Sequence, residues 1–205
     1  MKAAILLIFI LAISPCVGQQ SFYVKAGIGQ SKHFNYDYKF RNLRGTSLSP
    51  VLSGGADATL ELSKLGIISP YAGLGVSFLG TMHKECHHPA FYPGKIFRFR
   101  HIYLTLPVGF SIPVYESFGV DVALINGWRL NDRWSEYLGN PRIWDVAIQP
   151  GLFHNFDNWR LGISYYYGIR DVFGIGKLSK TGDFRFYNHA IHFNFAYKVR
   201  TFGKK

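Results

Sequence analysis

Residues 98–112 read Arg-Phe-Arg-His-Ile-Tyr-Leu-Thr-Leu-Pro-Val-Gly-Phe-Ser-Ile, and every second position from residue 102 onward is apolar. Successive side chains of an extended strand point to opposite faces, so this stretch predicts a strand with one apolar and one polar face. The same period of two recurs along most of the chain, and no segment keeps a helical period. The sequence therefore predicts an all-β protein.

Eight segments carry this alternation: residues 21–32, 54–63, 69–83, 97–112, 117–130, 142–156, 159–173 and 184–200. Connections 33–53, 84–96, 131–141 and 174–183 are long, whereas 64–68, 113–116 and 157–158 are short and contain turn-forming residues. Long and short connections alternate, which is typical of an up-and-down meander. We therefore expect an eight-stranded antiparallel up-and-down transmembrane β-barrel with all long loops at one end.

The distribution of charge decides which face points inward. The apolar face carries no charge, and the other face mixes glycine with charged residues. A lipocalin-like soluble barrel has its apolar face inside, whereas a membrane barrel turns that face toward lipid. Glycine and charge fill a soluble core badly, and aromatic residues gather near the predicted strand ends, so the sequence favours the membrane barrel. A lipocalin-like binder of a small apolar ligand is the soluble alternative.

The first residues predict export. Lys2 precedes the apolar run of residues 3–13, and small residues follow up to Gly18, which is the pattern of a secretory signal peptide. We expect a signal peptide at 1–18 and the barrel domain at 19–205. Only 17% of the residues are charged, against about 25% in a typical soluble domain. The many aromatic residues exclude a disordered chain, and two cysteines exclude a disulfide scaffold.

Three stretches resemble the PorT-like outer membrane β-barrel family of Bacteroidetes. They are Tyr103–Phe110, Gly162–Val172 and the closing Ile191–Lys198. The resemblance implies the small barrel fold and a place in the outer membrane of a Gram-negative cell, with both chain termini in the periplasm. It implies no biochemical activity, because most members of that family have none assigned.

The charged residues of the polar face predict ion pairs inside the barrel. Lys25 and Glu61 lie near the end that holds the chain termini, and Asp145 and Arg170 lie near the opposite end of adjacent strands. Buried charges persist when they are paired and hydrogen-bonded, so we expect these residues to be structural. Eight strands enclose an interior that side chains fill, which argues against a general pore.

The formal net charge is +11, and many basic residues lie in or beside the long connections. If these loops face outward, they meet the phosphates of lipopolysaccharide, which Arg and Lys bind by charge-assisted hydrogen bonds. The candidates for this contact are Arg41, Arg44, Lys95, Arg133 and Lys180. Outer-membrane lipid and lipopolysaccharide are thus the expected partners, beside an envelope protein that the sequence does not identify. No nucleic-acid-binding motif accompanies the charge.

Two further features bear on chemistry. His83, Cys86, His87 and His88 are metal-ligand types, but no second Cys/His pair accompanies them, so we expect neither a metal nor another cofactor. No nucleophile motif is present, which favours a structural or interaction protein over an enzyme. The alternative is a lipid A-modifying barrel enzyme, which would need a nucleophile within hydrogen-bond reach of a histidine at the outer rim.

Overall fold

The computed structural model describes residues 20–35, 46–62, 67–85, 96–130, 143–172 and 186–202. These residues form nine strands: β1 (Gln20–Asn35), β2 (Thr46–Ser49), β3 (Val51–Leu62), β4 (Ser69–Glu85), β5 (Ile96–Tyr115), β6 (Phe118–Arg129), β7 (Trp144–Phe156), β8 (Trp159–Gly168) and β9 (Phe186–Phe202). Within the described ranges, no helix is long and apolar enough to cross a membrane.

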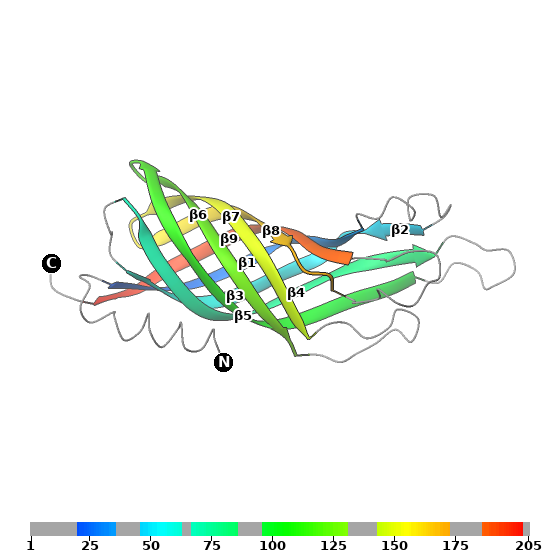
Figure 1. Cartoon of the computed structure of the whole chain (residues 1–205). Coiled ribbons are helices and arrows are strands. Elements are labelled where there is room, and N and C mark those ends of the chain that lie inside the picture. Colours follow the sequence, from blue (N-terminus) through cyan, green and yellow to red (C-terminus); the bar gives the residue numbers. More distant parts are fainter. Residues whose placement is uncertain are drawn as a thin grey trace, which may run out of the picture.

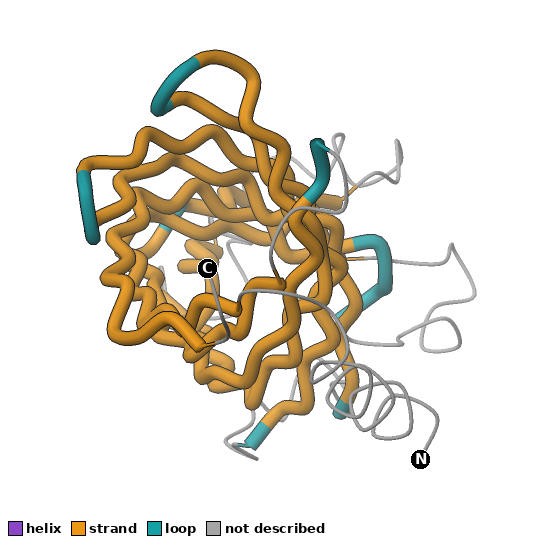
Figure 2. The backbone as a smooth tube through the Cα atoms, turned by 90° about the vertical axis from the view of Figure 1, so that its left-hand side faces the viewer, coloured by secondary structure: helices purple, strands orange, loops and turns teal. Residues whose placement is uncertain are grey.

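Eight of these strands close into a barrel. From β3 to β9, every two consecutive strands pair antiparallel, and the β4–β5 pair is one of these. β1 pairs with both β3 and β9, which closes the ring. Figures 1 and 2 show this ring from the side and along its axis. The predicted eight-stranded antiparallel up-and-down barrel is confirmed, and all eight segments found in the sequence are barrel strands.

The two ends of the barrel differ. The two-residue turns Glu116–Ser117 and Asp157–Asn158 lie at the end where β1 begins and β9 ends, and we call this the turn end. Glu116 and Asp157 have positive φ angles of 40° and 48°, the left-handed conformation that such tight turns require. The opposite end, which we call the loop end, is extended by the β4–β5 ladder with β2 along its edge (Figure 1).

Several strands begin or end a few residues away from the expected bounds, and two further differences concern the loop end. β2 lies within the connection that we expected to be free of strands, where Thr46–Ser49 pairs with Met82–Glu85 of β4. β8 ends at Gly168 instead of residue 173. Beyond it, the Ile169 amide donates to the Val146 carbonyl, and the Phe186 amide donates to the Asp171 side chain. The Val172 amide donates to the Phe186 carbonyl as well, so backbone and side-chain acceptors together hold this segment without a regular ladder.

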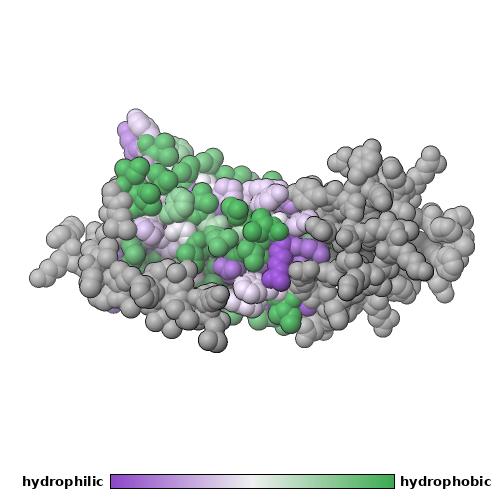
Figure 3. Space-filling view, in the orientation of Figure 1, coloured by the Kyte–Doolittle hydropathy of each residue, from purple (hydrophilic) through white to green (hydrophobic). Residues whose placement is uncertain are grey.

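The apolar face of the barrel points outward. Ile28, Leu124, Leu152 and Phe193 on four different strands are all exposed, at 45–65% of their surface. On the face shown in Figure 3, hydrophobic residues cover much of the described wall. This orientation contradicts the lipocalin-like alternative, which required the apolar face to be inside.

Aromatic residues flank this apolar surface at both ends. Near the loop end, the rings of Trp128 and Trp144 stack on the outer wall, with centroids 6.0 Å apart. Near the turn end, Trp159 packs against Phe195 and Tyr197. An apolar belt between two aromatic girdles is the surface pattern of barrels that cross an outer membrane.

Candidate functional site: the barrel lumen

The turn end of the lumen is closed by an ion pair between strands that are not neighbours. Arg160 of β8 reaches across to Glu61 of β3, with Nη1 2.9 Å from Oε2. Its Nε donates to Asn155 at 2.9 Å, and its guanidinium lies 4.3 Å and 4.8 Å from the ring centroids of Phe153 and Tyr23. The guanidinium is therefore hydrogen-bonded at its edge and stacked between rings on its faces.

This arrangement corrects the predicted pairing of Lys25 with Glu61. Register places Lys25 opposite Asp57, and Glu61 lies opposite Ser21, four residues further toward the turn end. Glu61 instead accepts hydrogen bonds from Arg160 and from the Ser111 hydroxyl, which lies 3.3 Å away. Lys25 faces a cavity in the lumen.

That cavity has a volume of about 90 Å³ and lies between the Arg160–Glu61 pair and Tyr166. Lys25, Asp57 and Asp121 line it, together with uncharged polar side chains such as Tyr71. Tyr71 donates to Asp121 Oδ2 at 3.3 Å. The middle of the barrel thus holds a charged, incompletely filled space enclosed by the strands.

One wall of the cavity is organised around a hydroxyl group. Gln149 Nε2 and Asn194 Nδ2 both donate to Ser164 Oγ at 2.7 Å. On the same side, His192 Nε2 lies 2.9 Å from the hydroxyl of Ser53, which is fully buried. Each of these side chains comes from a lumen-facing position of its strand, so the polar face predicted from the alternation is the inner wall.

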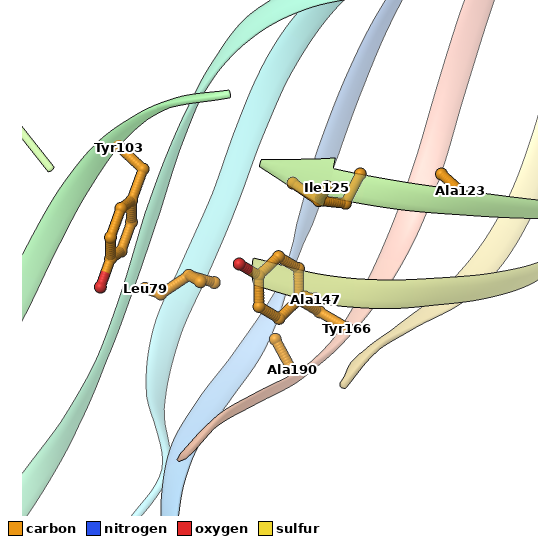
Figure 4. Packing of buried hydrophobic residues seen from close by; sticks show 7 residues of the cluster. All are labelled: Leu79, Tyr103, Ala123, Ile125, Ala147, Tyr166 and Ala190. Carbon is orange, nitrogen blue, oxygen red and sulfur yellow. The ribbon is translucent and has the colours of Figure 1, made fainter. Parts of the chain in front are cut away.

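Beyond the cavity, the lumen is packed. Buried residues from six barrel strands meet inside the ring, where Figure 4 shows them: Leu79, Tyr103, Ala123, Ile125, Ala147, Tyr166 and Ala190. We call this cluster the plug. Its polar edge is held by Asp145, whose Oδ2 accepts from the Tyr166 hydroxyl at 2.9 Å and from Asn188 Nδ2 at 2.7 Å.

The plug corrects the second predicted ion pair. Asp145 is 2% exposed and bonds the neutral Tyr166 and Asn188, whereas the guanidinium of Arg170 lies 5.5 Å from the ring centroid of Trp144 on the outer wall. Arg170 follows the end of β8, so the strand alternation that would have turned it inward no longer applies. Asp145 is therefore a lumen residue, as predicted, whereas Arg170 lies against Trp144 and forms no direct ion pair with Asp145.

Other predicted residues lie outside the described ranges. Arg41, Arg44, Lys95, Arg133 and Lys180 are among them, as are Cys86, His87, His88 and the expected signal peptide. His83 lies in β4, where its backbone pairs with Leu48 and Phe97, but its side chain is not described. Among the described residues, no three His, Cys, Asp or Glu side chains are grouped to hold a metal ion.

Two serine–histidine contacts bear on the enzyme alternative. Ser53 and His192 meet inside the lumen, where Ser53 has no exposed surface. Ser117 Oγ lies 3.2 Å from His154 Nδ1 at the turn end, which is the end opposite to the one that the alternative requires. Near the loop end, Tyr165 hydrogen-bonds His189 on the outer wall, and the Tyr167 ring packs edge-on against the same histidine. Within the described part of the chain, neither serine–histidine pair has an acidic side chain hydrogen-bonded to its histidine.

Fold and site thus define a closed β-barrel with an apolar outside and a polar, plugged inside. No protein-family model matches the sequence, and the comparison with curated proteins gives no match. Among solved structures, the chain is similar to the outer membrane protein OprG from Pseudomonas aeruginosa, with 8% identity, a TM-score of 0.47, and coverage of 92% of this chain and 97% of that one.

Two further likenesses are weaker. A mutant of the monoaromatic hydrocarbon channel TodX has 15% identity and a TM-score of 0.31, with coverage of 90% of this chain and 58% of that chain. The translocator domain of the autotransporter NalP from Neisseria meningitidis has 10% identity and a TM-score of 0.31, with coverage of 97% and 96%.

Proposed function

We propose that this protein resides in an outer membrane as a closed barrel and has a structural or interaction role at the cell envelope, without acting as a general pore or an enzyme. The apolar outer wall between two aromatic girdles supports residence in lipid. A wall this apolar costs free energy in water, because each exposed Å² of apolar surface costs roughly 25 cal/mol relative to burial.

The observation that carries the non-pore role is the closure of the lumen at two levels. The plug fills the interior toward the loop end, and the Glu61–Arg160 pair bridges it toward the turn end. A cavity of about 90 Å³ lies between these two levels. A continuous aqueous channel would require both levels to rearrange.

The proposed orientation has the turn end and both termini in the periplasm and the loop end outside. In this orientation, the basic residues of the long connections face lipopolysaccharide, and Arg170 beside Trp144 lies at the outer membrane interface. We keep kinship with the PorT-like barrels as part of the proposal, supported by the three stretches named above. No role in secretion follows from it.

The experiment that tests this proposal has two readouts. The chain is extracted in detergent and run on gels with and without heating, and the folded protein is then reconstituted into planar bilayers. We expect heat-modifiable migration together with the absence of large, steady conductance steps. A protein that stays soluble without detergent would contradict the membrane assignment, and steady nanosiemens conductance would contradict the closed lumen.

A further inference from the structure

The lumen cavity contains two polar atoms that have no partner in the protein. Asp57 Oδ1 and Ser77 Oγ are buried without a hydrogen bond, and both residues line the cavity. They are diagonal neighbours on adjacent strands, because Asp57 of β3 pairs with Gly75 of β4, and Ser77 lies two residues beyond Gly75 on the same face. A buried, unsatisfied carboxylate oxygen costs more than a typical lost hydrogen bond, so a donor is expected to occupy the space in front of it.

The surrounding charges do not supply that donor. Lys25 is the direct cross-strand neighbour of Asp57, yet the two side chains form no ion pair within 4.0 Å. Asp121 on β6 accepts a single long hydrogen bond from Tyr71. The ionisable residues that line the cavity include three acids (Asp57, Glu61, Asp121) and two bases (Lys25, Arg160), so their formal charges sum to −1 when all five are ionised.

The opposite wall also presents acceptors to the cavity. The amide groups of Gln149 and Asn194 use a nitrogen to donate to Ser164, so their carbonyl oxygens remain for other partners. Asn194 Oδ1 lies over Gly27, so close that a Cβ atom on residue 27 would be only 2.7 Å from it. The cavity is therefore small, negatively charged and richer in acceptors than in donors.

We propose that this cavity binds a small monocation that carries N–H donors, namely ammonium or a primary alkylammonium ion of methylammonium size. Such an ion supplies a positive charge and several donors from one compact group. Its N–H donors match the Asp57 carboxylate and the Ser77 hydroxyl on one wall and the Asp121 carboxylate on another. A quaternary ion such as tetramethylammonium supplies the charge without N–H donors and is bulkier. The inference goes beyond the envelope role and does not depend on it.

The test uses the full-length mature chain folded in detergent micelles, with methylammonium chloride as the probe in ligand-observed NMR. Tetramethylammonium chloride at equal concentration is the control for charge without N–H donors. We expect saturable binding of methylammonium by the parent protein and none of tetramethylammonium. Ser77→Ala should weaken methylammonium binding at least about threefold, and Asp57→Asn at least about tenfold. Ser31→Ala, which removes a buried lumen hydroxyl that bonds the Gly80 backbone outside the cavity, should leave binding unchanged.

Several outcomes would overturn the inference. They are the absence of saturable methylammonium binding by the folded parent, equal binding of tetramethylammonium, and unchanged affinity in Ser77→Ala. If Asp57→Asn does not reach the heat-modifiable folded form, the comparison of Ser77→Ala with Ser31→Ala decides alone. A cavity filled only by water gives the first of these outcomes. Because folding and membrane insertion are scored separately on gels, a failure of the envelope proposal is distinguishable from a failure of this one.

Discussion

Glu61 and Arg160 offer a direct measure of how much the lumen network stabilises the barrel. We expect Glu61→Gln and Arg160→Met each to destabilise the fold, because each change leaves a partly buried charge without its partner. In a double-mutant cycle, the two losses should not add, since the second change removes a charge that is already unpaired.

The size of the coupling follows from burial and geometry. Breaking a fully buried pair costs about 3–5 kcal/mol, whereas an exposed pair is worth about 0.2–1 kcal/mol. The two side chains are 18% and 14% exposed, and the pair has one hydrogen bond of 2.9 Å and one of 3.5 Å. We therefore expect an interaction free energy of about 1.5–3 kcal/mol for the Glu61–Arg160 pair, between these two limits.

The assay is reversible urea unfolding of the four proteins in lipid vesicles, followed by tryptophan fluorescence and by the heat-modifiable band. Arg200→Met is the matched control, since Arg200 is an exposed cation that lies 5.0 Å from the Phe202 ring centroid. We expect that control to change the unfolding free energy by less than about 1 kcal/mol. Additive effects of Glu61→Gln and Arg160→Met, to within about 0.5 kcal/mol, would refute the pair as a stabilising element.

Other regions of the barrel give independent tests. Leu124→Arg, at an exposed position midway along β6, should cost about 2–4 kcal/mol in vesicles, and refolding as efficient as that of Leu124→Ala would disprove a lipid-facing wall. Tyr166→Ala removes a ring from the plug and a donor to Asp145, so we expect a loss of about 3–5 kcal/mol in urea unfolding, with parent-like stability as the contrary result. In a Cys86→Ser background, an impermeant thiol reagent on intact cells should label Ser47→Cys of β2 but not Asn158→Cys of the β7–β8 turn, and the reverse pattern would invert the proposed orientation.

The strand pattern could be predicted from the sequence because it depends on a local period. Each strand needs only to alternate, and a slip of one residue would turn every apolar side chain into the lumen. The misplaced end of β8 has a different cause. Asp171 accepts the Phe186 amide through its side chain, and alternation carries no information about such a contact. β2 could not be predicted, because its four residues are too few to show an alternating pattern.

The ion pairs could not be predicted in the same way, because they depend on closure. Reasoning from adjacent strands paired Lys25 with Glu61 and Asp145 with Arg170. In the barrel, β3 and β8 are separated by two strands, and the lumen is narrow enough for Arg160 to reach Glu61 across it. Which residues meet across a barrel depends on strand tilt and stagger together, and neither can be derived from the sequence of a single strand.

One signal for the lumen carboxylates is nevertheless present in the register. Asp57 has Gly75 as its direct cross-strand partner, and Asp121 has Gly151. A Cβ on Gly75 would lie 2.5 Å from Asp57 Cβ, and one on Gly151 would lie 2.3 Å from Asp121 Oδ1. The missing Cβ atom at Gly151 therefore leaves room for the Asp121 carboxylate, and the one at Gly75 leaves room for the side chain of Asp57. Glycine on the polar face of a narrow barrel thus has a specific physical role: where it is the direct partner of an acid, it makes room for the acidic side chain.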